Sequence, residues 1–193
     1  MLQKPSERGF SYIDVMIALV ILMVGILASA AALTANLVRS YETEKQVIAK
    51  QAALSTIESI FSARDISRTG AVSGWDSVGN VGSNPDAGGN AQGIFLTGFC
   101  PIREDMGWDG VAGTSDDACP AGGACQVAGR PDNTSNVTRG FERRVVITDL
   151  QDPDRPTPPQ PISRRRIDVT VRYNVNQLQR EQTVSTIITN YSE

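Results

Sequence analysis

The hydrophobic pattern of the chain begins with a long apolar segment near the N-terminus. Between residues 15 and 38 no residue carries a charge, and charged residues recur from Arg39 onward. As an α-helix this stretch would be roughly 36 Å long, against a hydrocarbon core of about 30 Å. The pattern therefore predicts a transmembrane helix over about residues 10–38.

The helical pattern continues beyond this apolar segment. Between Ile26 and Thr69 there is neither glycine nor proline, and good helix formers are frequent. We therefore expect one helix over residues 10–64, within a helical segment 10–65. In its second half, apolar residues gather within a sector of about 120° on a helical wheel. We expect this stripe to contact the chain's own sheet: Ala53, Leu54, Ile57, Ile60 and Phe61.

Residues 66–140 have a different character. They are rich in glycine, asparagine and serine, with only short apolar pieces, and are expected to be mostly a variable loop. The segment 152–161, DPDRPTPPQP, is expected to be an extended loop as well, because proline lacks the N–H that a strand ladder needs.

Strand patterns return in the C-terminal region, residues 141–193. Three segments are rich in β-branched residues, and the middle one alternates strictly between apolar and polar positions: 141–148, 167–173 and 183–191. We expect residues 174–182 to connect the last two. The predicted fold is therefore α+β, a long N-terminal helix packed on a C-terminal antiparallel sheet.

The length, charge and composition of the chain exclude several classes of function. A chain of 193 residues has room for one ordinary domain and a membrane segment. The net charge of −3 does not favour nucleic acid as a partner. The absence of histidine removes Ser-His-Asp and Cys-His catalysis, and we expect no enzymatic activity. The arginine clusters at 143–144 and 164–166 are interpreted as a solvated strand face with edge protection.

The charges that flank the apolar segment predict its orientation. Residues 1–9, MLQKPSERG, include Lys4 and Arg8, whereas positive charge beyond the segment starts at Arg39. The positive-inside rule places residues 1–9 in the cytoplasm and the residues after about 39 outside.

Asp14 is the acid within the otherwise apolar run. If the chain were cut after Gly9, Phe10 would become the N-terminus and Asp14 would lie one turn into the helix, where its charge suits the positive end of the helix dipole. The new α-amine, mostly protonated at neutral pH, is a natural counter-ion in the same chain or a neighbour. This spacing predicts subunit docking in the membrane.

These residues resemble the class III signal of type IV pilins and pseudopilins. The shared features are a short basic leader ending in Gly9, then Phe10, then an acid at the fifth position counted from Phe10, then a long apolar run. The stretch FSYIDVMIALVILMVGILA is especially similar to PilV-like minor pilins and the related minor pseudopilins. In that family the acid is usually glutamate, and Asp14 keeps the charge on a shorter stem.

The resemblance implies a processing route and a set of partners. A prepilin peptidase would cut after Gly9 and N-methylate Phe10, and Asp14 would help the subunit enter a filament with other pilins and the inner-membrane assembly machinery. The chain would first lie in the inner membrane as a single-pass protein with a periplasmic C-terminal domain, and later in a pilus or pseudopilus.

Three functions are compatible with this pattern. The first is a minor pilin that enters or primes a type IV pilus, and the second is a minor pseudopilin of a type II secretion system. The third uses Ala28-Ser29-Ala30 as an ordinary signal-peptidase site, which would release a soluble secreted calcium-binding protein beginning at Ala31.

The loop at residues 105–117 is a candidate calcium site. If Asp105 is position 1 of an EF-hand loop, Asp109 falls at position 5 and Asp116 at position 12, but position 3 is glycine. The stretch DGVAGTSDD is similar to the acidic glycine loop that binds calcium in major pseudopilins, which implies Asp109, Asp116 and Asp117 as ligands, with Asp105 a further candidate. The alternative is an acidic surface turn.

The cysteines fall in the same loop region, at Cys100, Cys119 and Cys125. In an oxidising compartment outside the cytoplasm we expect one disulfide and one remaining thiol, with the pair unassigned.

Overall fold

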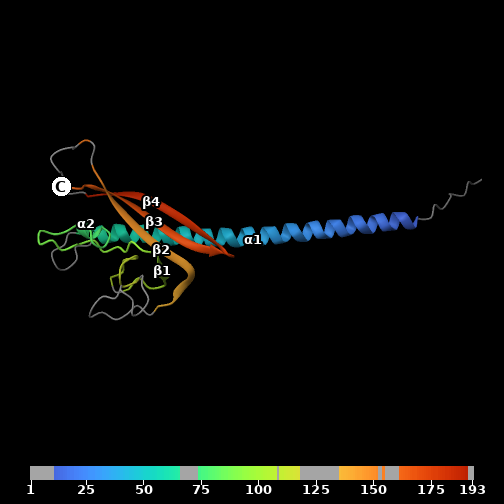
Figure 1. Ribbon diagram of the computed structural model, residues 1–193, viewed down its shortest axis with the longest axis horizontal. Helices are drawn as coiled ribbons and strands as arrows, with labels where there is room; N and C mark the ends of the chain where they lie inside the picture. Colours follow the sequence, from blue (N-terminus) through green and yellow to red (C-terminus); the bar gives the residue numbers. More distant parts are fainter. Residues whose placement is uncertain are drawn as a thin grey trace, which may run out of the picture. The chain divides into compact units, whose positions relative to one another are not determined.

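The structure is a computed structural model that describes residues 11–65, 74–107, 109–117, 135–151, 154 and 161–190. The chain divides into two compact units, Met1–Thr43 and Glu44–Glu193. Helix α1, Tyr12–Asp65, is continuous across this boundary (Figure 1). The predicted helix is confirmed, and its end lies one residue beyond the predicted Arg64.

Local sequence explains why α1 is so long. No proline interrupts it, and its one glycine, Gly25, lies in the apolar part. Asp14 lies in the first turn and Arg64 in the last, so each charge complements the partial charge of the helix end near it.

A β-sheet forms the second unit together with the packed half of α1, residues 44–65. Within the described residues the sheet has four strands in the order β1 (Cys100–Arg103), β2 (Val137–Leu150), β3 (Arg164–Val175) and β4 (Leu178–Thr189). All neighbours are antiparallel. The predicted α+β fold, a long N-terminal helix packed on an antiparallel sheet, is confirmed (Figure 1).

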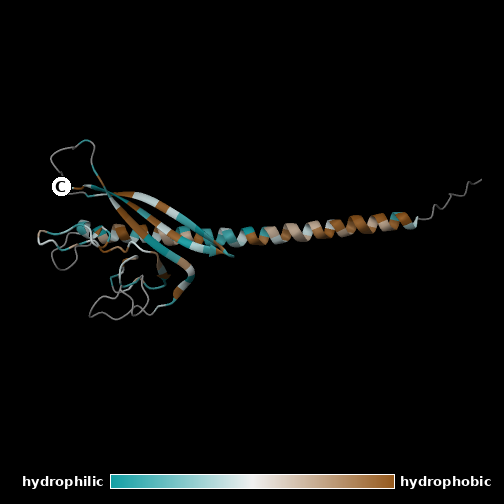
Figure 2. Cartoon of the chain, viewed as in Figure 1, coloured by the Kyte–Doolittle hydropathy of each residue, from teal (hydrophilic) through white to brown (hydrophobic). Residues whose placement is uncertain are grey.

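The core lies between the packed half of α1 and the sheet. Alanines at the centre of the helix face let the strands approach closely, and each large apolar side chain buried against them contributes about 1.5–3 kcal/mol. The alternation along the strands is visible in Figure 2 as hydrophobic and hydrophilic bands. The buried residues of α1 and β3 include Ala49, Ala53, Ile57, Ile60, Ala63, Ile167, Val169 and Val171.

The predicted helix stripe is correct at its centre and wrong at one edge. Ala53, Ile57 and Ile60 are buried and Phe61 is partly buried, but Leu54 is 42% exposed. The buried face is centred on alanines, which are only weakly hydrophobic and so contribute little to a helical-wheel pattern. The prediction was therefore shifted toward the bulkier side chains on one flank.

The strands are longer than predicted, and the predicted connection at residues 174–182 is wrong. The turn between β3 and β4 is Asn176–Gln177 alone, and Asn176 has φ 55°. Asparagine adopts this left-handed conformation more readily than most residues, so no glycine is needed. The first four residues of β4, LQRE, are exposed and three of them are polar, so they show no alternation between apolar and polar positions.

The described part of residues 66–140 is mostly irregular, as predicted, apart from α2 (Gly74–Ser77), β1 and the start of β2 at residues 137–140. Asn80 fixes this region to β2, because its side-chain amide donates to Val145 O (2.8 Å) and accepts from Ile147 N (2.8 Å). Gly93 is needed nearby, since a Cβ there would lie 2.1 Å from Asn80 O. The predicted proline-rich loop at 152–161 falls largely outside the described residues.

Candidate functional site

The first candidate site is the apolar half of α1, residues 12–43. Every described side chain from Ser11 to Tyr41 is exposed, including Ile21 at 66% and Leu33 at 63%. In Figure 2 most of the ribbon of this half has the colour of hydrophobic residues. By length and composition, α1 is the helix that can cross a membrane within the described residues. A water-exposed apolar surface of this size normally marks a membrane or protein contact.

The hydroxyl groups in this half have partners inside the helix. Ser29 Oγ donates to Gly25 O (2.8 Å), and Thr34 Oγ1 donates to Ala30 O (2.6 Å). Polar groups that bond to their own helix can lie in lipid without an unsatisfied donor. The same helical turns run through residues 28–30, whereas a signal-peptidase site prefers an extended segment.

Asp14 lies in the first turn of α1 with its side chain exposed. Its N–H donates to Ser11 O (3.0 Å), which begins the helical hydrogen bonding. Gly9 and Phe10, the residues of the predicted cleavage site, lie outside the described residues. The pairing of Asp14 with an amine at Phe10 stays a prediction.

The second candidate site is the acidic loop, residues 105–117, whose carboxylates accept hydrogen bonds mainly from backbone N–H groups of the same loop. Asp109 Oδ1 accepts a hydrogen bond from Val111 N (2.7 Å), and Asp116 Oδ2 accepts one from Asp109 N (3.1 Å). Asp116 Oδ1 also accepts from the hydroxyl of Thr114 (2.5 Å). These bonds close the loop on itself.

Asp117 differs from its neighbours because it is buried against an arginine. Its Oδ2 lies 2.7 Å from Nη2 of Arg143 on β2, and the two side chains are 3% and 7% exposed. The backbone N–H groups of Gly113 and Thr114 also donate to this carboxylate (3.0–3.1 Å). Asp117 and Arg143 therefore form a buried, hydrogen-bonded ion pair.

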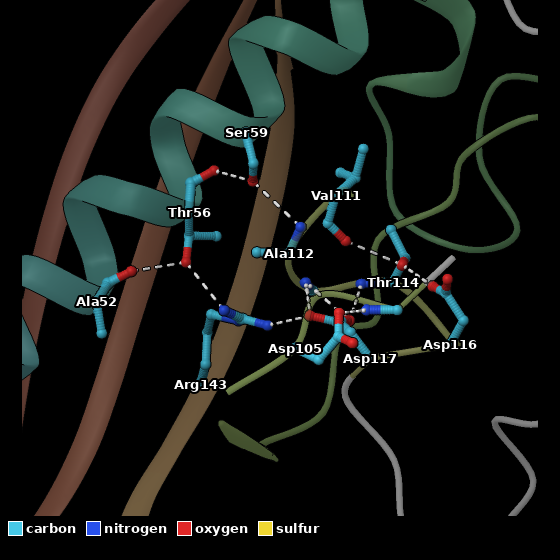
Figure 3. A network of polar contacts seen from close by, with 12 residues as sticks. Ala52, Thr56, Ser59, Asp105, Val111, Ala112, Thr114, Asp116, Asp117 and Arg143 are labelled. Carbon is cyan, nitrogen blue, oxygen red and sulfur yellow. Dashed lines mark hydrogen bonds and ion pairs between the residues drawn. The ribbon is translucent and has the colours of Figure 1, made fainter. Parts of the chain in front are cut away.

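The network extends from Arg143 to the packed half of α1 (Figure 3). Arg143 Nη1 donates to Thr56 Oγ1 (3.2 Å), which donates to Ala52 O (2.7 Å). A second link joins Ala112 N to Ser59 Oγ (3.2 Å). The loop, β2 and α1 are thus held together by polar contacts beside the apolar core.

Burial has the largest effect on the pKa of Asp117. It raises the pKa of Asp117 to about 6, against the opposing effects of the Arg143 charge and of the hydrogen bond from Gly113 N. The proton is therefore held more tightly in the folded chain than in water.

The loop does not fit the predicted calcium ligand set of Asp105, Asp109, Asp116 and Asp117. Within the described part of the chain, no group of three or more histidine, cysteine, aspartate or glutamate side chains is placed to hold a metal ion. Asp105 Oδ1 accepts from Gly107 N (3.1 Å), and Asp117 is already paired with a guanidinium whose charge would repel a cation. The geometry instead favours the alternative, an acidic surface turn, except that Asp117 is buried rather than at the surface.

The interpretation of both arginine clusters as a solvated strand face is wrong for Arg143 and Arg165. Arg165 is 4% exposed, and its guanidinium lies 4.3 Å from the centre of the Trp75 ring. It donates to the carbonyl oxygens of Trp75 and Val78 and pairs with Asp149 Oδ1 (2.8 Å). Both arginines alternate in phase with the buried residues of their strands, a signal that could have revealed their burial.

The cysteine prediction is not tested by the geometry. Cys100 is the first residue of β1 and is half-buried, whereas Cys119 and Cys125 lie outside the described residues.

Comparison with protein-family models, curated proteins and solved structures gives no match.

Proposed function

We propose that the chain is a membrane-anchored minor pilin, cut after Gly9 by a prepilin peptidase, that enters or primes a type IV pilus through its apolar helix. In this proposal Phe10 is N-methylated, Asp14 docks the subunit on its neighbours, and the sheet unit is carried into the periplasm and then the filament. The role is structural and requires no catalysis.

One observation carries the proposal: a single helix has two halves with opposite burial. Residues 12–41 of α1 are exposed and lack charge after Asp14 up to Arg39, while buried residues from Ala49 onward pack on the sheet. A subunit that moves from a membrane into the core of a filament needs a helix with one apolar half. An acid near the start of that helix can pair with a charged group of a neighbouring subunit.

Two related functions use the same features. A minor pseudopilin of a type II secretion system would carry the same signal and helix, and the neighbouring genes distinguish it from a pilin. A secreted calcium-binding protein is less well supported, because α1 is helical through residues 28–30 and the acidic loop does not fit a calcium shell.

Variants of Gly9 and Asp14 test processing and assembly separately. When the full chain is expressed with a prepilin peptidase and the pilus machinery, we expect Gly9→Val to keep the leader. Asp14→Ala should be cut but should appear in sheared filaments at least about tenfold less, because the docking charge is lost. Asp14→Glu should restore incorporation, since the charge returns.

The matched control is Ser11→Ala, an exposed change near the same helix end, which should behave like the parent chain. Normal incorporation of Asp14→Ala would contradict the docking role. A chain that keeps its leader in the presence of the peptidase would contradict the processing step.

A further inference from the structure

We draw no further inference here: the strongest candidate, the half-buried Cys100 of β1 opposite Arg143 in the β1–β2 ladder, carries nothing because it rests on a single cysteine and the other two cysteines of the chain lie outside the described residues.

Discussion

At the scale of single residues, the pair of Asp117 and Arg143 is the most consequential contact in the sheet unit. Both side chains are at most 7% exposed, and each has further hydrogen-bond partners. Such a pair contributes little net stability, but removing one partner leaves a buried charge and costs about 3–5 kcal/mol. We infer that the pair fixes the position of the acidic loop on β2.

The raised pKa of Asp117 predicts the sign of a pH effect. Because its pKa is about 6 in the folded chain and 3.8 is the ordinary value, the stabilisation from its proton is complete below about pH 3.8 and is lost as the pH rises through 6. Asp117→Asn does not titrate. The free energy of unfolding of the parent chain relative to this variant should fall by about 2–3 kcal/mol from pH 4 to pH 7. Urea unfolding followed by tryptophan fluorescence measures it.

Asp86→Asn is the control with the opposite sign. Hydrogen bonds from the backbone and side chain of Asn90, with a further one from Gly88 N, lower the pKa of Asp86. The parent chain should therefore lose stability relative to Asp86→Asn as the pH falls through the lowered pKa. A parent chain that gains stability relative to Asp117→Asn between pH 4 and pH 7 would contradict the account of the buried pair.

At the scale of elements, α1 combines two kinds of surface in one continuous helix. Its apolar half carries large side chains that stay exposed, whereas its packed half buries small residues such as Ala49 and Ala53. Large side chains in the first half suit lipid or other helices. Alanines in the second half let the sheet lie close against the helix.

The packed half should respond strongly to a cavity at its centre. Ile60 is fully buried, and Ile60→Ala should lower the free energy of unfolding by about 2–5 kcal/mol. Leu54→Ala removes a similar volume from the same helix but at a 42% exposed position, and should cost less than about 1 kcal/mol. The measurement is denaturant unfolding of the full chain in mild detergent, with the fluorescence of buried Trp75 contributing to the signal.

Equal effects of Ile60→Ala and Leu54→Ala would contradict the assignment of the buried helix face.

The sequence predicted the elements whose pattern is local. The absence of proline and glycine after Ile26 determines the long helix, and alternation in residues 167–173 determines β3. Strand β1 was missed because CPIR is short and contains proline, so it shows no alternation. The tight turn at Asn176 was missed because it uses no glycine.

The buried arginines were missed for a different reason. Arg143 finds Asp117 26 positions earlier in the chain, and Arg165 finds Val78 87 positions earlier. A charge that looks solvated in a local pattern is buried when distant segments supply its partners. The acidic loop was misinterpreted for the same reason. Its local sequence suggests a calcium site, but Asp117 pairs with the guanidinium of Arg143, which is distant in the sequence.

At the scale of the whole molecule, the chain joins a membrane-compatible helix to a small α+β unit. The unit has an apolar core and a buried ion pair that joins the acidic loop to β2. The proposed pilin function requires the helix to lose its leader and to present Phe10 and Asp14 together.

The most direct measurement is the intact mass and N-terminal sequence of the protein purified from its own host. The account predicts a mature chain that begins at N-methylated Phe10, with residues 1–9 absent. A chain that begins at Ala31 would contradict it and indicate an ordinary secretory signal, and a chain that retains residues 1–9 would contradict prepilin processing.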